Sequence, residues 1–222
     1  MGKDKIRRFK AVKEFDNFIE PILKEDCLFK GKWRTHFFKN NNPIVLELGC
    51  GKGEYSIGMA HYFPKKNFIG IDIKGARMFV GAKQAIDQKV KNIAFLRTKI
   101  DFIECCFEEN EVDEIWLTFS DPQPKKNNKR LTSPIFINRY KKILKEGGII
   151  HMKTDSDLLF EYTEQQIKSA PYKCLSLTWD LYGDYINQIN GVMGEILNIK
   201  THYEKIFTKK GAKIKYCKFK IS

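Results

Sequence analysis

The chain has 222 residues, of which 42% are hydrophobic, and a formal net charge of +13. This length suits one well-buried domain with an appended arm, and it is short for two domains. No apolar run approaches the ~20 residues that a membrane-spanning helix needs. The first residues also lack the apolar core of a signal peptide, so we expect neither a membrane protein nor a secreted one.

The six cysteines and four histidines offer no recognisable metal or catalytic spacing. The sequence contains no Cys-x-x-Cys pair, no Cys–His spacing suited to zinc and no histidine spacing that suggests a triad. Reduced cysteines are typical of the cytosol. We therefore expect a cytoplasmic protein that binds no metal ion.

The first 40 residues have the composition of a basic amphipathic arm. A run of asparagines before a proline, Asn40–Pro43, follows this arm. Such a run is typical of a loop, so it marks the start of the core. We therefore divide the chain into an arm, residues 1–40, and a domain, residues 41–222.

From residue 44 onward, strand-like and helical patterns alternate. Such alternation predicts right-handed crossovers and a doubly wound α/β fold, with helices on both faces of a mostly parallel sheet. Two later runs, Cys174–Trp179 and Ile214–Ile221, are expected to add an antiparallel pair at one edge, which gives seven strands. Residues 181–198 have no clear pattern, and we expect a mobile loop there. The other expected strands lie near 44–48, 67–72, 92–97, 113–119 and 147–153, and the expected helices near 54–63, 75–89, 101–107, 133–144 and 156–168.

The first strand of the core runs into a glycine-rich loop with Gly49, Gly51 and Gly53. Glycines allow the backbone to turn sharply and to approach a ligand closely, although loops with several glycines are common. Glu47 precedes the loop and would repel the pyrophosphate of a dinucleotide, whereas it suits the cationic amino end of S-adenosylmethionine. Asp72 ends the next strand, where nucleotide folds place a carboxylate for ribose hydroxyls. A methyl-donor site is therefore favoured.

Asp121 stands where an apolar run, Ile115–Phe119, meets a basic loop. Pro122 follows it directly, and a proline there restricts the backbone and removes an amide donor. An open α/β sheet binds ligands beyond the carboxyl ends of its strands, so Asp121 is a candidate reactive carboxylate. The alternative is a solvated turn that ends a strand. Four cations follow within nine residues: Lys125, Lys126, Lys129 and Arg130.

Positive charge is concentrated in three parts of the chain. Residues 121–145 hold eight Lys/Arg against one acid, residues 200–222 hold the same numbers, and residues 1–40 hold eleven against six. Cationic clusters bind phosphates by releasing counterions, so we expect a polyanion beside Asp121. Nucleic acid is favoured over an anionic membrane surface, and a merely solubilising lysine-rich surface is the alternative.

Two further motifs are candidates for the ligand edge of the sheet. Lys153–Asp155 ends a strand, and Asp155 either faces the ligand or caps the helix that begins near Ser156. Thr201–Glu204 precedes the basic C-terminal tail, and its first and last residues also have the spacing of a capping box. Both interpretations stay open for each motif.

Taken in chain order, these motifs resemble those of the bacterial tRNA (guanine-N7-)-methyltransferases, which are class I, Rossmann-like enzymes that use S-adenosylmethionine. The resemblance covers roughly residues 40–217. A glycine loop alone would indicate only the class I fold, whereas the combination of motifs is specific. It consists of Ser120–Lys126, Lys153–Asp155 with Leu159–Tyr162 after it, and Thr201–Glu204.

The resemblance implies transfer of a methyl group from S-adenosylmethionine to N7 of a guanine in the variable loop of tRNA. It also implies a role for each matching residue, with Asp121 as the catalytic carboxylate. The methyl donor would contact Glu47, Gly49, Gly51, Gly53, Asp72, Lys99 and Asp121. The guanosine would contact Lys125, Asp155, Thr201, His202, Tyr203 and Glu204.

The chain departs from the family pattern in several places. Gln123 stands where the family usually has tryptophan, and Lys99 where it commonly has an acid, with Asp101 nearby. Asp72 stands where glutamate is frequent, and the basic loop after Lys125 is about two residues shorter than usual. Two other functions stay open: a non-catalytic RNA-binding protein on the same fold, and a methyltransferase that acts on an exocyclic base amine.

Overall fold

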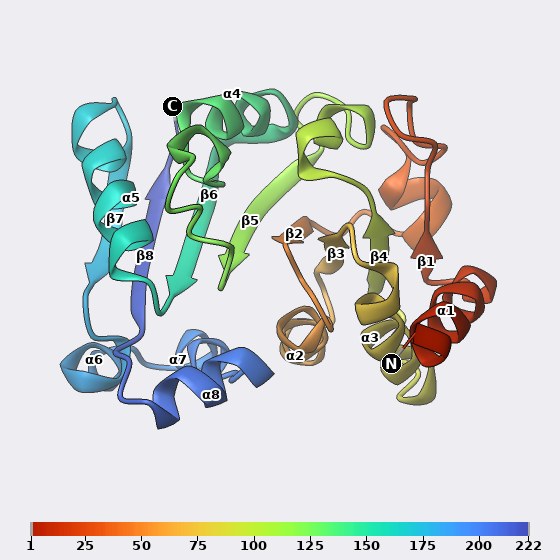
Figure 1. Cartoon of the computed structure of the whole chain (residues 1–222). Helices are drawn as coiled ribbons and strands as arrows, with labels where there is room; N and C mark the ends of the chain where they lie inside the picture. The colour runs from red at the N-terminus through yellow and green to blue at the C-terminus, as the bar shows by residue number, and fades with distance from the viewer. Residues whose placement is uncertain (1, 222) are drawn as a thin grey trace.

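A sheet of eight strands forms the centre of the molecule (Figure 1). The computed structural model describes residues 2–221, without the side chains of residues 2, 3 and 184. The strands are β1 (Phe18–Ile19), β2 (Ile44–Leu48), β3 (Asn67–Asp72), β4 (Ile93–Arg97), β5 (Val112–Thr118), β6 (Leu144–Thr154), β7 (Lys173–Thr178) and β8 (Lys215–Lys220). Their order is β1-β4-β3-β2-β5-β6-β8-β7. β8 is antiparallel to both β6 and β7, whereas the other neighbouring strands are parallel.

Helices cover both faces of the sheet. Side chains from α4 and α5 pack in one buried cluster with Ile44 and Leu46, and side chains from α2, α3 and α7 pack in a second cluster with Val45. No helix among residues 2–221 is long and apolar enough to cross a membrane. The α-helices are α1 (Gly2–Ala11), α2 (Glu54–Tyr62), α3 (Gly75–Asp87), α4 (Pro134–Ile143), α5 (Asp157–Ser169), α6 (Ile186–Gln188), α7 (Val192–Leu197) and α8 (His202–Lys209).

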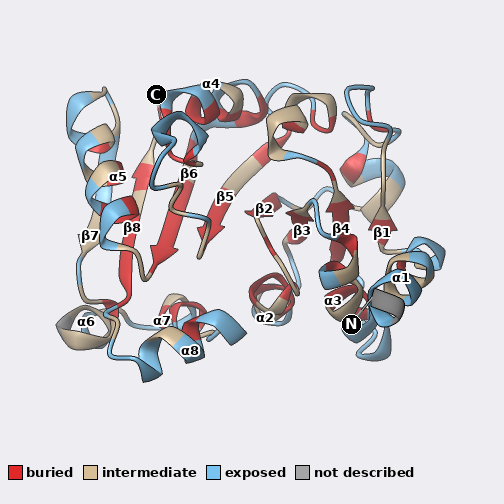
Figure 2. Ribbon diagram, viewed as in Figure 1, coloured by how far each residue is buried: buried red, intermediate tan, exposed pale blue. Residues whose placement is uncertain are grey.

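The central strands form because their sequences are almost continuously apolar. All five side chains of β2 are buried, and Figure 2 shows the neighbouring strands buried along most of their length. Strands covered on both faces have this composition, in contrast to the alternating pattern of a half-exposed strand. β2 and β3 begin and end at the expected residues, and the doubly wound α/β fold with an antiparallel C-terminal pair is confirmed.

The sheet has one strand more than expected, because part of the N-terminal arm joins it. Phe18 and Ile19 pair in parallel with Phe95 and Leu96 of β4. Helix α1 packs beside α3 at the same edge (Figure 1). The helix expected near 101–107 is a 3-10 helix, Ile100–Cys105.

Most of residues 181–198 are helical, so the expectation of a loop there was wrong. A π-helical segment, Leu181–Tyr185, leads into α6 and then α7. Leu181, Ile196 and Leu197 are fully buried in the cluster beneath α2 and α3. Their irregular spacing matches neither a helix nor a strand period, which is why the sequence pattern did not reveal this segment.

Candidate functional site

A cleft opens where β2, β3, β4, β5 and β6 end. Its main cavity has a volume of about 730 Å³, and an adjoining cavity of about 410 Å³ shares Gly49, Asp72 and Gln123 with it. Open parallel sheets bind their ligands at this edge. Five of the predicted site residues line the main cavity, namely Gly49, Asp72, Asp121, Asp155 and Tyr203, and Lys99 lines the adjoining one.

The glycine loop after β2 turns through three residues with positive φ. Gly49, Gly51 and Gly53 have φ of +84°, +57° and +73°, a region that favours glycine. A Cβ on Gly53 would lie 2.4 Å from the Phe95 ring, so no side chain fits there. At Gly49 and Gly51, nothing lies within 4 Å of that position. The backbone of these two glycines is therefore open to a ligand.

Asp72 fastens the glycine loop to the start of α3. Its Oδ2 accepts a hydrogen bond from the amide of Gly51 at 3.0 Å, and its Oδ1 accepts one from the amide of Lys74 at 2.8 Å. The carboxylate therefore lies in the wall of both cavities, at the end of β3. This is the place where nucleotide folds bind ribose hydroxyls.

Glu47 lies behind the glycine loop, with only 2% of its surface exposed. Its carboxylate accepts hydrogen bonds from the Ser56 amide at 2.9 Å and from the hydroxyls of Ser56 and Thr118. Burial raises the pKa of Glu47 to about 7, although these hydrogen bonds lower it. Glu47 therefore braces the loop against α2.

Asp121 lies in a loop whose backbone is constrained on both sides. Phe119 and Gln123 have φ of +52° and +46°, which is uncommon for residues with a side chain. The Gln123 amide donates to Oδ1 of Asp121 at 2.9 Å, and the Phe119 amide donates to the Lys153 carbonyl at 2.8 Å. Strained conformations of this kind cluster at functional sites. The loop holds an exposed carboxylate in the wall of the cleft.

Arg130 supports this loop from inside the protein. It is 3% exposed, its Nε donates to the Pro122 carbonyl at 2.9 Å, and its guanidinium lies 4.5 Å from the centre of the Tyr162 ring. Arg130 is therefore buried, although it is one of the four cations that follow Asp121. Lys125 and Lys126 are exposed, and Lys129 pairs with Asp101 at 3.2 Å.

The interpretation of Asp155 as a helix cap was wrong, because Ser156 caps α5. The Ser156 hydroxyl accepts a hydrogen bond from the Leu159 amide at 3.2 Å, as an N-cap does. The carboxyl group of Asp155 instead lines the main cavity, and partial burial raises its pKa.

The predicted motif Thr201–Glu204 forms the start of α8, and its residues face different ways. The Thr201 hydroxyl caps the helix by accepting from the Glu204 amide at 3.2 Å, and the His202 amide donates to Glu54 Oε2 at 2.8 Å. Glu204 is fully buried and ion-paired with Lys153. Tyr203, which is 41% exposed, lines the cavity.

Lys74, Arg77 and Phe207 are among the residues that line the main cavity and that the sequence pattern missed. Phe207 lies one helical turn after Tyr203, so its spacing was an available signal. The Arg77 guanidinium lies 5.7 Å from the centre of the Tyr203 ring. Arg77 follows Asp72 by five residues in an ordinary helical pattern, and nothing in that pattern indicated its place beside Tyr203.

No group of three or more His, Cys, Asp or Glu side chains suited to a metal ion occurs in the described part of the chain. The six cysteines are free thiols.

Comparison with known proteins places this cleft in a class. The family model described as putative methyltransferase matches residues 41–217. The crystal structure of the 16S rRNA methyltransferase KamB is similar, with a TM-score of 0.64 at 12% identity, over 90% of this chain and 98% of that chain. A geranyl diphosphate C-methyltransferase from Streptomyces coelicolor A3(2), in complex with S-adenosyl-L-homocysteine, gives 0.51 at 15% identity, over 80% and 72% of the chains. The fold and the glycine loop define a class I methyltransferase.

Proteins that are similar in sequence define the family more narrowly than the fold does. The tRNA (guanine-N(7)-)-methyltransferase of Bacteroides fragilis is 49% identical over 223 residues, which are 99% of this chain and 86% of the relative. The protein of the same name from Christiangramia forsetii is 47% identical over 226 residues, 99% of both chains. The chain belongs to the tRNA (guanine-N(7)-)-methyltransferase family, as its motifs predicted.

Proposed function

We propose that this protein methylates N7 of a guanine in the variable loop of tRNA, with Asp121 as the catalytic carboxylate. Its family consists of tRNA (guanine-N(7)-)-methyltransferases, and the chain spans nearly the whole length of these relatives. The observation that supports the residue assignment is the shared cavity, since Asp72, Asp121, Asp155 and Tyr203 line one space of about 730 Å³. One space therefore offers carboxylates to a methyl donor and an aromatic ring to a base.

The donor end of the cleft is the glycine loop with the carboxylate of Asp72. The open backbone at Gly49 and Gly51 suits close approach of S-adenosylmethionine, and Asp72 suits its ribose hydroxyls. Bound there, S-adenosylmethionine supplies the electrophilic methyl group. Glu47 adds negative charge from behind the loop for the donor's ammonium, Gly53 shapes the turn, and Lys99 borders the adjoining cavity.

The guanine end lies across the cleft, beside α8. Tyr203 offers an exposed ring on which a base can stack, and Asp155 offers a carboxyl group beside it. Thr201, His202 and Glu204 hold the start of α8 in place and so position Tyr203. Lys125 is an exposed cation of the neighbouring loop, suited to a phosphate of the same nucleotide.

The reaction needs no general base. Guanine N7 carries a lone pair and no proton, and the methyl transfer moves positive charge onto the purine. Asp121 stabilises that developing charge and accepts hydrogen bonds from the guanine N1 and N2 protons. Alignment of N7 with the methyl group supplies most of the remaining rate. The target base must leave its stack to reach the cleft, as other bases do in enzymes that modify them.

The setting of this activity is the cytoplasm, where tRNA is the partner. Six free thiols suit a reducing compartment, and the net charge of +13 suits a polyanionic substrate.

The test uses purified protein, tRNA and S-adenosylmethionine with a labelled methyl group. We expect the label in 7-methylguanosine after the tRNA is digested to nucleosides. A matched transcript in which each variable-loop guanine is replaced by adenine should accept no label, while a transcript with changes in another loop should accept it.

Each alternative function gives a different result in this assay. A non-catalytic RNA-binding protein would bind tRNA and transfer no label. An enzyme that acts on an exocyclic amine would place the label in N2-methylguanosine or N6-methyladenosine. If the variable-loop variant still gives labelled 7-methylguanosine, the methylated guanine lies elsewhere in the tRNA.

A further inference from the structure

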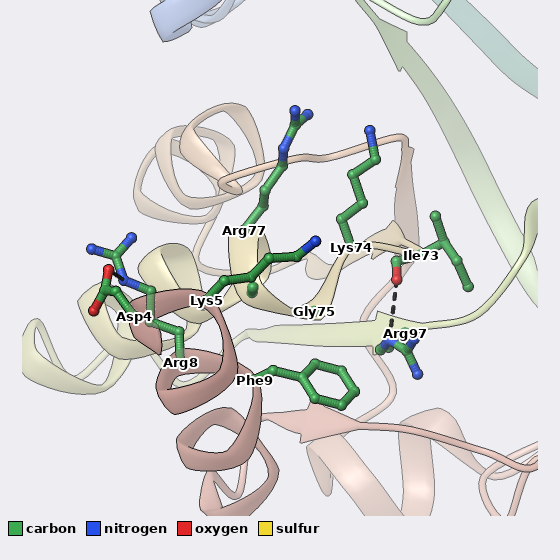
Figure 3. Close-up of a pocket in the computed structure, with 10 residues that line it drawn as sticks. Asp4, Lys5, Arg8, Phe9, Ile73, Lys74, Gly75, Arg77 and Arg97 are labelled. Atoms are coloured by element: carbon green, nitrogen blue, oxygen red, sulfur yellow. Dashed lines mark hydrogen bonds and ion pairs between the residues drawn. The ribbon is translucent and has the colours of Figure 1, made fainter. Parts of the chain in front are cut away.

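Besides the two cavities of the cleft, a cavity of about 660 Å³ lies between α1 and the start of α3 (Figure 3). Figure 3 shows Lys5 extending from α1 across the start of α3, toward Lys74 and Arg77. Five cations and one carboxylate line this cavity, which we name the arm pocket: Lys5, Arg8, Lys74, Arg77, Arg97 and Asp4.

A packed aromatic side chain fixes the arm pocket. Phe9 of α1 lies directly against Gly75, since a Cβ on Gly75 would come within 2.9 Å of its ring. The guanidinium of Arg97 lies 4.7 Å from the centre of the same ring and donates to the Ile73 carbonyl at 3.0 Å. Helix α1 is therefore held at a set position on α3. Lys5 extends from it over the start of α3, whereas Arg8 turns toward Asp4 (Figure 3).

The positive charge of the arm pocket is only partly neutralised by the protein. Asp4 pairs with Arg8 at 2.9 Å and also with Arg7 at 2.8 Å, outside the pocket, and Arg97 pairs with Glu20. The ion pairs formed within residues 2–221 include none with Lys5, Lys74 or Arg77. Unpaired cations on a concave surface attract phosphate groups.

The arm pocket borders the cleft. Ile73, Lys74 and Arg77 line both cavities, and Arg77 also lies against Tyr203. A ligand that enters the cleft beside Tyr203 and extends toward α1 therefore passes along these cations. A polynucleotide that follows this path has phosphates along it.

We infer that the arm pocket binds backbone phosphates of the tRNA, at nucleotides next to the guanine in the cleft. This inference rests on the proposed function, because that function supplies the polyanion. The N-terminal arm is thereby part of the substrate-binding surface, and its contribution is independent of the base that is methylated.

Two charge-matched double variants of the full chain test the inference. Lys5→Gln/Arg8→Gln removes two cations of the arm pocket. Arg7→Gln/Lys10→Gln removes two exposed cations of the same helix that do not line the pocket, and each double removes one arginine that pairs with Asp4. The measurements are tRNA affinity at several salt concentrations and S-adenosylmethionine affinity by calorimetry.

The pocket double should bind tRNA about tenfold more weakly near 0.1 M salt. Its slope of log affinity against log salt should fall by about 1.4 to 1.8, since each phosphate that is no longer neutralised lowers the slope by about 0.7 to 0.9. The control double should lose no more than about threefold, and both should bind S-adenosylmethionine normally, since neither changes the cleft.

Equal losses in the two doubles, or no loss in the pocket double, would overturn the inference. Loss of binding to phosphatidylglycerol vesicles with unchanged tRNA affinity would assign the pocket to a membrane and overturn it as well. Failure of the proposed function gives a different result from failure of this inference. The wild-type protein would then leave tRNA unmethylated, whatever the tRNA affinities of the two double variants.

Discussion

Lys153 and Glu204 form an ion pair with both side chains fully buried, and Lys153 Nζ lies 2.9 Å from Oε1 of Glu204. The same ammonium donates to the carbonyls of Leu197 at 2.7 Å and Ile199 at 3.1 Å. Burial lowers the pKa of Lys153 to about 8, although the charge of Glu204 raises it. One side chain at the end of β6 thus fixes both α7 and α8, and α8 presents Tyr203 to the cleft.

Lys153→Met should lower the free energy of unfolding by about 3–5 kcal/mol, because it leaves the charge of Glu204 buried without a counter-ion. The double variant Lys153→Met/Glu204→Met should recover much of this loss. Urea denaturation of the two variants and the wild type measures both effects. A single variant within about 1 kcal/mol of wild type would mean that the buried pair contributes little.

Glu47 predicts a specific dependence of stability on pH. Its pKa of about 7 in the folded protein exceeds the ordinary value of 4.5, so between these values the folded state binds the proton more tightly than the unfolded chain does. The contribution of Glu47 to the free energy of unfolding is therefore fully present below pH 4.5. It falls by about 3 kcal/mol as pH rises to 7.

Glu47→Gln keeps the neutral shape and removes this titration. The difference in the free energy of unfolding between wild type and Glu47→Gln should therefore shift against the wild type as pH rises from 5 to 7.5. Denaturation of both proteins across this range measures it. A difference that stays constant with pH would show that Glu47 does not titrate in this way.

The three lysines after Asp121 should contribute to tRNA binding. Lys125→Gln/Lys126→Gln/Lys129→Gln should weaken tRNA affinity and lower its salt slope by up to ~0.9 for each phosphate that these lysines neutralise. Arg130 is kept, since its burial against Pro122 and Tyr162 makes it part of the loop's support. The charge-matched control Lys141→Gln/Lys168→Gln/Lys173→Gln should keep the wild-type slope. Equal slopes of log affinity against log salt in both triple variants would show that the loop does not contact the RNA.

The core strands were predictable because their signal is local. β2 and β3 are short apolar runs that end at glycine or aspartate, and both have the expected bounds. Residues 181–198 were not predictable, since Leu181, Ile196 and Leu197 are buried by packing in a cluster with side chains from distant parts of the chain. β1 was missed for a similar reason, because two residues form a strand only through pairing with Phe95 and Leu96 of β4.

The candidate site was predictable where its residues lie at the carboxyl ends of parallel strands. Asp72 ends a parallel strand, and Asp121 and Asp155 follow parallel strands, so the carboxyl edge of the sheet brings them together. Position along the sheet does not tell which charged side chains turn inward. Arg130 and Glu204 belong to polar motifs and yet are buried, because their partners Tyr162 and Lys153 lie far away in sequence.

Asp121→Asn tests the central claim, that a carboxylate at this position stabilises the positive charge on the purine. The change keeps the size of the side chain and removes its charge. Removal of one preorganised electrostatic interaction typically slows a reaction by roughly 10²–10³-fold. Asp87→Asn, at the exposed end of α3, is the matched control and should react at the wild-type rate.

The measurement is single-turnover methyl transfer to tRNA with enzyme and S-adenosylmethionine in excess, beside a thermal melt of each variant. We predict that folded Asp121→Asn transfers the methyl group roughly 10²–10³-fold more slowly than wild type, with tRNA affinity changed little. Transfer at the wild-type rate by folded Asp121→Asn would contradict the account.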